Sequence, residues 1–203
     1  MKKNKIEFFY DCSSPWTYLA FSEIENLSNR HNLELIWKPI LVGGVFNSVN
    51  PSVYESRANP VKEKRDYSNK DLQDWCKVRN IEINWPKVFP VNSVKAMRGA
   101  FYAIDKGVIS EYSSKVFYSY WTKGKDISQP SVLSEIINSL NMNEGEFFSF
   151  IEKDSTKEAL KSNTQDLMDR GGFGSPTIFV NESDMFFGND RLYLIDELIK
   201  INP

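Results

Sequence analysis

Apolar and polar positions near the start of the chain predict a strand, a helix and a second strand. The aromatic run at 6–10 favours a strand. Ser14 and Pro15 form a typical helix start, with serine at the N-cap and proline in the first turn. Apolar residues then recur at helical spacing up to about Arg30, at Trp16, Leu19, Ala20, Ile24 and Leu27. A second strand at 33–37, closed by Pro39, completes a β–α–β unit with parallel strands.

The centre of the chain has mainly helical periodicity. Glycines and Asn-Pro pairs between Gly43 and about Asn59 favour a loop-rich segment. Beyond it, apolar stripes predict helices at 71–78, 93–105, 110–121, 130–140, 144–152 and 155–170. The last of these ends at Gly171 and Gly172, which are typical of a helix C-terminus.

The period changes to that of strands near the C-terminus. Residues 176–180 and 185–187 favour two strands joined by a turn at 181–184, and an amphipathic helix follows from Arg191. The two ends of the chain therefore predict one mixed α/β sheet of about four strands, built from residues 1–40 and about 155–203. A linker and an all-helical insertion would occupy about 41–154.

Composition narrows the classes of function. The chain has 203 residues, of which 41% are hydrophobic and 26% charged, as in a globular protein with one domain or one domain plus an insertion. The formal net charge of -2 gives no general attraction to nucleic acid or anionic membranes. Two cysteines and one histidine exclude a disulfide scaffold, a cysteine-built zinc site and a multi-histidine metal site.

Hydropathy predicts neither a secretion signal nor a membrane span. The apolar run after the basic N-terminus is interrupted by Glu7 and stops at Asp11, whereas a signal peptide needs roughly 7–15 apolar residues. We therefore expect a cytoplasmic, reducing environment with Cys12 and Cys76 as free thiols. Cys12, close to a helix start, is a candidate reactive thiol, although burial as a small hydrophobe is the stronger expectation. His31 is expected to cap a helix C-terminus rather than to act in catalysis.

Ser14 is the residue whose position most clearly suggests a role in chemistry. It stands where a strand ends and a helix begins, and backbone N–H groups at a helix N-terminus stabilise an anion such as a thiolate. A serine followed by proline is also a common N-cap with no further role, so the motif alone leaves both readings open.

The segment from Asp11 to Tyr18 resembles the active-site turn of DsbA-type disulfide oxidoreductases. Ser14 and Thr17 stand where those proteins have two cysteines, so dithiol exchange is lost at this turn. The chain is more similar to the related 2-hydroxychromene-2-carboxylate isomerases and kappa-class glutathione transferases, in which serine occupies the first position. The resemblance implies a thioredoxin-like fold with a helical insertion, and a catalytic Ser14 that hydrogen-bonds the sulfur of bound glutathione.

Two later segments carry the same resemblance. Gly174-Ser175-Pro176-Thr177 resembles the cis-proline loop of thioredoxin-like proteins, which implies that Ser175 and Pro176 contact glutathione. The alternative is an ordinary trans proline at a strand start. The segment around Asn189 and Asp190 resembles the loop that holds the γ-glutamyl group, although Asp190 could be only a first-turn acid.

The predicted insertion adds further candidates by resemblance. Asn50 and Lys64 are implied glutathione contacts, and Lys62 competes with Lys64 for that role. Asn92 could cap a helix or line the substrate pocket. The candidate substrate-binding set is completed by Pro15 and Trp16, which directly follow Ser14.

These residues together predict a glutathione-dependent cis–trans isomerase of aromatic 2-oxo acids, similar to 2-hydroxychromene-2-carboxylate isomerase. The expected partners are glutathione and a small aromatic substrate of a catabolic reaction, with no metal, and the resemblance implies a homodimer. Three alternatives stay open: a kappa-class-like transferase or peroxidase, a non-catalytic thioredoxin-fold binding module, and a disulfide oxidoreductase that uses Cys12.

Overall fold

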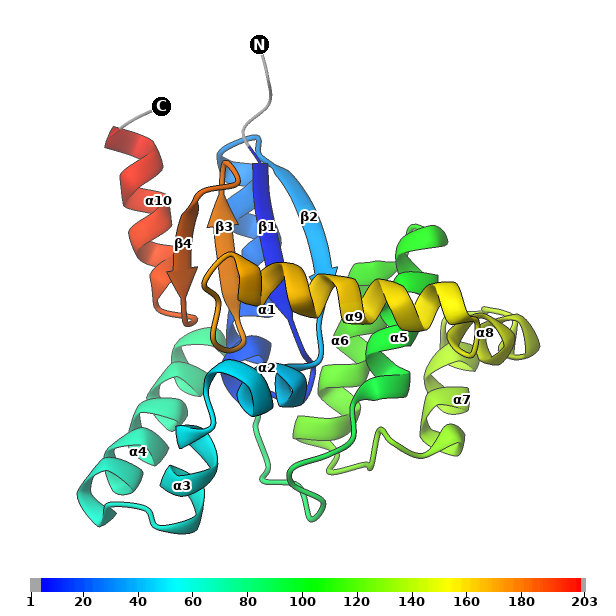
Figure 1. Ribbon diagram of the computed structural model, residues 1–203, viewed down its shortest axis with the longest axis horizontal. Helices are drawn as coiled ribbons and strands as arrows, with labels where there is room; N and C mark the ends of the chain where they lie inside the picture. The colour runs from blue at the N-terminus through cyan, green and yellow to red at the C-terminus, as the bar shows by residue number, and fades with distance from the viewer. Residues whose placement is uncertain (1–4, 202–203) are drawn as a thin grey trace.

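The computed structural model describes residues 5–201 and is shown in Figure 1. In chain order its elements are β1 (Lys5–Tyr10), α1 (Pro15–Arg30), β2 (Glu34–Pro39), α2 (Val42–Val49), α3 (Ser52–Ala58), α4 (Lys62–Arg79), α5 (Val94–Asp105), α6 (Ile109–Phe117), the π-helical turn η1 (Tyr118–Thr122), α7 (Pro130–Ser139), α8 (Glu144–Ile151), α9 (Asp154–Asp169), β3 (Thr177–Val180), β4 (Asp184–Phe187) and α10 (Arg191–Ile201).

The sheet has four strands in the order β2-β1-β3-β4. β1 and β2 run parallel with Lys5 opposite Glu34, as the β–α–β pattern predicted. β3 runs antiparallel to β1, and β4 runs antiparallel to β3 to form the expected hairpin. The mixed α/β sheet and the helical insertion are confirmed.

Alternation along β1 gives the sheet two buried faces, because successive side chains point to opposite sides. Phe8 and Tyr10 belong to the main apolar cluster, together with residues of α1 and α10 such as Ile24 and Ile195. Phe9 points the other way and packs with residues of α2 and α9 and with the neighbouring β3 side chain. Figure 1 shows α9 crossing the sheet on this second side, above α2. Both faces of β1 are therefore covered, and its carboxyl end, where Ser14 follows, is held between the two helical layers.

Local sequence explains both ends of α1. Ser14 is its N-cap and Pro15 occupies the first turn, where a missing N–H costs no hydrogen bond. His31 is the C-cap, and its Nε2 lies 2.8 Å from a carboxylate oxygen of Asp196 on α10. The predicted capping role of His31 is confirmed, and the contact ties the end of α1 to the last helix.

The prediction of a loop-rich segment between Gly43 and Asn59 is wrong. This segment forms α2 and α3, and Figure 1 shows α3 leading into the projecting α4. Val45 of α2 is fully buried in the Phe9 cluster, and a carboxylate oxygen of Asp11 accepts from the Val42 N–H at 2.8 Å. Tertiary packing and this cap outweigh the cost of about 1 kcal/mol for each glycine in a helix.

Other boundaries differ less. The helix expected at 71–78 extends over Lys62–Arg79. Its first half is polar and exposed and carries no apolar stripe, so the sequence pattern did not predict that half. The helix expected at 110–121 ends as a π-helical turn. Within 5–201, no helix combines the length and the apolarity that a membrane crossing needs.

Candidate active site

Ser14 lies at the junction of the first helix and the loop before β3. Its side-chain oxygen accepts from the Thr17 N–H at 3.2 Å and donates to the Ser175 carbonyl at 3.1 Å. The Thr17 and Ser175 hydroxyl oxygens lie 2.8 Å apart. The two sequence motifs, 161 residues apart, are therefore brought into direct contact.

The Ser175–Pro176 peptide bond is cis, as the resemblance implied. The Ser175 hydroxyl accepts from the Asp11 N–H at 3.0 Å, which fixes this loop against the end of β1. The Pro176 carbonyl accepts from the Gly188 N–H at 3.2 Å, so the third motif lies beside the second. All three motifs of the resemblance converge at the end of the sheet where β1 ends and β3 begins.

Asn189 in the third motif carries an unpaired polar group. The residue is buried, and its side-chain Nδ2 has no hydrogen-bond partner among the described residues. A buried amide donor without an acceptor costs free energy, so such an atom marks a place where a ligand can supply the acceptor. Asp190 next to it is half-exposed and pairs with Arg191 at 3.2 Å, at the start of α10.

Asp11 is a site residue that the sequence analysis treated only as part of a turn. Its carboxylate is fully buried and accepts from the Ser13 N–H at 2.9 Å, the Val42 N–H at 2.8 Å and the Ser93 hydroxyl at 3.0 Å. Burial raises the pKa of the Asp11 carboxyl, and these hydrogen bonds act against the increase. One side chain thus holds the Ser14 turn, the start of α2 and the loop before α5 together. An acidic residue directly after the aromatic run that ends β1 was the available signal.

The remaining candidates from the insertion are spread more widely. Asn50 ends α2 and donates to the Phe173 carbonyl at 3.1 Å, just before the cis-proline loop. Lys64 is exposed on α4, and Lys62 pairs with Asp66 at 2.8 Å. The structure therefore brings Asn50 close to the Ser175 loop but leaves Lys64 on the outer surface of this chain, and both assignments stay predictions.

The candidate substrate-binding residues also differ in their surroundings. Asn92 is exposed and accepts from the Val94 N–H at 3.1 Å, which is a turn contact at the start of α5. Pro15 is buried in the first turn of α1. Trp16 is half-buried against a small cluster that contains Leu19 and Cys76. Their contact with substrate stays a prediction.

Both cysteines are buried free thiols. Burial raises the pKa of Cys12 well above its ordinary value and also raises the pKa of Cys76. A thiol that stays protonated and covered by side chains is a poor nucleophile, so the geometry favours the packing role expected for Cys12.

An aromatic wall lies beside the Ser14 turn. Trp121 donates through Nε1 to the Cys12 carbonyl at 2.8 Å, and its ring packs on Phe89 and Trp85 with centroid separations of 6.1 and 5.8 Å. Trp85 is more than half exposed. Flat apolar surface of this kind suits an aromatic ligand.

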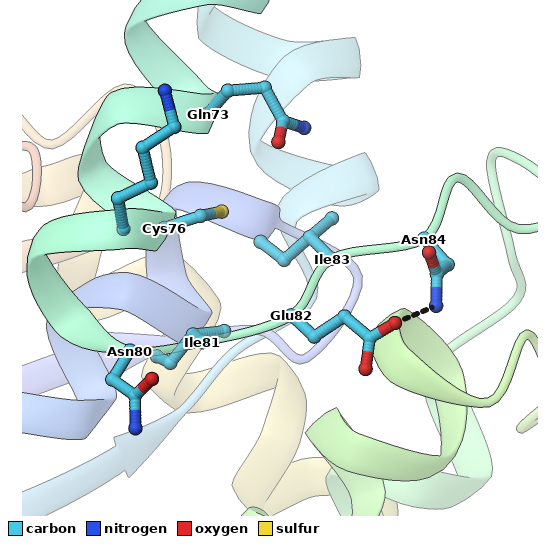
Figure 2. A pocket seen from close by; sticks show the side chains of 8 residues that line it. Gln73, Cys76, Asn80, Ile81, Glu82, Ile83 and Asn84 are labelled. Carbon is cyan, nitrogen blue, oxygen red and sulfur yellow. Dashed lines mark hydrogen bonds between the residues drawn. The ribbon is translucent and has the colours of Figure 1, made fainter.

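Two surface cavities lie apart from this site. The larger, of about 370 Å³, is formed by the C-terminal half of α4 and the segment that follows it, and Figure 2 shows Cys76 and Ile83 among the side chains that line it. The smaller, of about 320 Å³, lies between β1 and the end of α9, next to Glu7 and Arg170. No sequence-predicted site residue lines either cavity. Across residues 5–201, no group of His, Cys, Asp and Glu side chains is arranged to hold a metal ion.

Comparison with known proteins supports the family resemblance. The model of the DSBA-like thioredoxin domain family matches residues 5–200. A 2-hydroxychromene-2-carboxylate isomerase of Pseudomonas putida is 28% identical over 94% of this chain and 92% of its own. Human glutathione S-transferase kappa 1 is 26% identical over 96% of this chain and 90% of its own.

Solved structures give the same picture. The structure of a 2-hydroxychromene-2-carboxylate isomerase superposes with a TM-score of 0.80 at 25% identity, covering 96% of this chain and 94% of that one. A probable DsbA oxidoreductase from Streptomyces coelicolor superposes with a TM-score of 0.77 at 10% identity, covering 96% and 88%. The second likeness concerns the fold alone.

Proposed function

This chain belongs to the DSBA-like thioredoxin domain family, and from that premise we propose that it is a glutathione-dependent cis–trans isomerase of aromatic 2-oxo acids. The observation that carries the proposal is a hydroxyl, Ser14, at the N-terminus of α1 and in contact with the Ser175 carbonyl of the cis-proline loop. Relatives named as 2-hydroxychromene-2-carboxylate isomerases support the reaction class.

Dithiol exchange is the activity that this site cannot perform. A mixed disulfide needs a sulfur atom at the helix N-terminus, and both Ser14 and Thr17 present oxygen there. The thiol therefore has to come from a ligand, and the helix N-terminus favours that thiol in its ionised form.

The residues present suit glutathione. The unpaired Nδ2 of buried Asn189 offers a hydrogen-bond donor to the γ-glutamyl part, and Asp190 offers a carboxylate to its ammonium group. The Ser175 carbonyl would accept from the cysteinyl N–H, and Ser14 would donate its proton to the sulfur. Asn50 and Lys64 are proposed for the remaining contacts.

The chemistry that glutathione supplies when bound is a thiolate that adds reversibly to a conjugated carbon, so that a double bond becomes single and can rotate. Ser14 and the N–H groups of α1 hold the negative charge on sulfur. Trp85 and Phe89, which pack on the buried Trp121, would offer a flat apolar surface to the substrate beside the turn.

A kappa-class-like transferase or peroxidase is the second candidate, favoured by the similarity to glutathione S-transferase kappa 1. The two functions differ in product, because isomerisation returns glutathione unchanged whereas conjugation consumes it. Incubation with 2-hydroxychromene-2-carboxylate and with 1-chloro-2,4-dinitrobenzene, followed by thiol assay, separates them. The homodimer that the resemblance implies stays a prediction that light scattering tests.

The test of the proposal is a comparison of Ser14→Ala with Ser22→Ala. Ser22 lies on the same helix and donates only to the Leu19 carbonyl, so it controls for the loss of a hydroxyl. Ultraviolet absorbance of the bound thiolate at neutral pH should fall in Ser14→Ala, together with isomerase turnover, and should stay at the parent level in Ser22→Ala. Equal thiolate absorbance in parent and Ser14→Ala would refute the role of Ser14.

A further inference from the structure

The guanidinium group of Arg57, near the end of α3, lies between two aromatic rings. Its Cζ atom is 5.4 Å from the ring centroid of Phe46 on α2 and 5.3 Å from that of Phe89 in the loop before α5. We call these three side chains the arginine sandwich. Cation–π contact with two rings holds the guanidinium group in place more firmly than a free surface arginine would be held.

The arginine sandwich connects the two walls of the candidate active site. On one side, the Phe46 ring lies beside Gly174 of the cis-proline loop, where a Cβ would be in van der Waals contact with it at 3.8 Å. On the other side, Phe89 packs against Trp121, which donates to the Cys12 carbonyl two residues before Ser14. Arg57 is therefore linked through Phe46 to the cis-proline loop, and through Phe89 and Trp121 to the turn that carries Ser14.

The charge of Arg57 is not used by the protein itself. Of the residues that the structure describes, none forms an ion pair or hydrogen bond with its guanidinium group. Arg65, on the next helix α4, is paired with Asp66 at 3.3 Å. The rings that hold Arg57 carry no acceptor, so its N–H donors are free for a ligand.

Resting on the function proposed above, we infer that Arg57 binds the carboxylate of a ligand seated in front of Ser14. A fixed planar guanidinium matches a carboxylate through two parallel hydrogen bonds. Two ligands of this site carry one, the 2-oxo acid substrate and the glycyl end of glutathione. Phe46 and Phe89 add flat apolar surface beside the charge, which fits the substrate class in particular.

The experiment uses the full chain in four forms: parent, Arg57→Gln, Arg57→Lys and Arg65→Gln. Arg65→Gln is the matched control, because it removes an exposed arginine from the neighbouring helix. Calorimetric titration with glutathione and with its glycyl monoethyl ester measures the contact to the tripeptide. Quenching of tryptophan fluorescence by phenylpyruvate, without thiol, measures binding of an aromatic 2-oxo acid.

Loss of a charge-assisted pair of hydrogen bonds in Arg57→Gln should weaken binding of one carboxylate probe by about tenfold or more. Weaker phenylpyruvate with unchanged glutathione identifies the substrate as the source. Weaker glutathione, with the ester already weak in the parent, identifies the glycyl carboxylate. Arg57→Lys should retain part of the affinity, since it keeps the charge and loses the planar donors.

Unchanged affinity for both probes in Arg57→Gln, relative to Arg65→Gln, would overturn the assignment while leaving the proposed function intact. A parent that binds phenylpyruvate through Arg57 but no glutathione would refute the proposed function and keep the carboxylate assignment. A parent that binds neither probe would overturn both. Arg57 is exposed, so circular dichroism of the variants should match that of the parent.

Discussion

Replacing Asp11 by asparagine tests how the active-site turn is held. The Asp11 carboxylate accepts hydrogen bonds on both oxygens, from the Ser13 N–H on one and from the Val42 N–H and Ser93 hydroxyl on the other. Asparagine has one acceptor oxygen and one NH₂ group in the same space. The Ser93 hydroxyl can rotate to accept, but a backbone N–H cannot, so one backbone donor must face the new NH₂ group.

The expected loss of stability follows from this missing hydrogen-bond acceptor. A buried N–H left without an acceptor costs about 1–3 kcal/mol, and the hydrogen bonds that remain lose their charge assistance. Relief of the burial penalty on the carboxylate, the cause of its raised pKa, offsets part of this loss. We therefore expect Asp11→Asn to lower the free energy of unfolding by about 1–3 kcal/mol.

Urea denaturation followed by tryptophan fluorescence measures the change. Asp105→Asn, at the exposed end of α5, is the control and should change stability by about 0.5 kcal/mol or less. If the free energy of unfolding of Asp11→Asn lies within about 0.5 kcal/mol of that of the parent, the Asp11 carboxylate does not hold the three segments together. A variant that is destabilised but keeps the parent's ligand affinities would refute any role in positioning Ser14.

Three further outcomes are expected. The pKa of Asp196 is lowered to about 2, mainly by its hydrogen bond from Lys200. The ionised carboxylate therefore adds at most about 2 kcal/mol of stability above about pH 4, and this is lost as the pH falls towards 2. Acid unfolding of Asp196→Asn should lack this pH-dependent stabilisation. In Gly99→Ala, the new methyl group would overlap the buried Tyr112 hydroxyl, and a calorimetric Tm at or above that of the parent would contradict the expected loss of about 1–3 kcal/mol. Cys12 is 1% exposed with a raised pKa, so it should react with a disulfide reagent in urea and not in the native protein, and rapid native labelling, located by peptide mapping, would show that it is accessible.

The parts of the fold that the sequence predicted are those governed by local chemistry. Ser14-Pro15 specifies the start of α1, and alternating aromatic side chains specify β1, because capping and strand pleating act within a few residues. The hairpin of β3 and β4 was equally local. The contacts between Ser14 and the cis-proline loop were reached through resemblance, since no spacing rule connects positions 161 residues apart.

The parts that were missed depend on tertiary contact. Gly43 and Gly44 predict a loop, yet α2 forms because Val45 enters the core and Asp11 caps the helix start. The participation of Asp11 follows from the convergence of three chain segments at one carboxylate. Arg57 is an ordinary surface arginine in the sequence, and only the approach of Phe46 and Phe89 distinguishes it.

The hydrogen bond from Ser14 to the Ser175 carbonyl bears on which thiols the site accepts. A hydroxyl has a single proton, so turning it towards an incoming sulfur leaves the buried carbonyl without a donor. The cysteinyl N–H of glutathione can donate to that carbonyl in place of Ser14, whereas a simple alkanethiol such as ethanethiol has no second donor. The site would thus disfavour thiols that lack a hydrogen-bond donor beside the sulfur, before any recognition of the γ-glutamyl or glycyl ends.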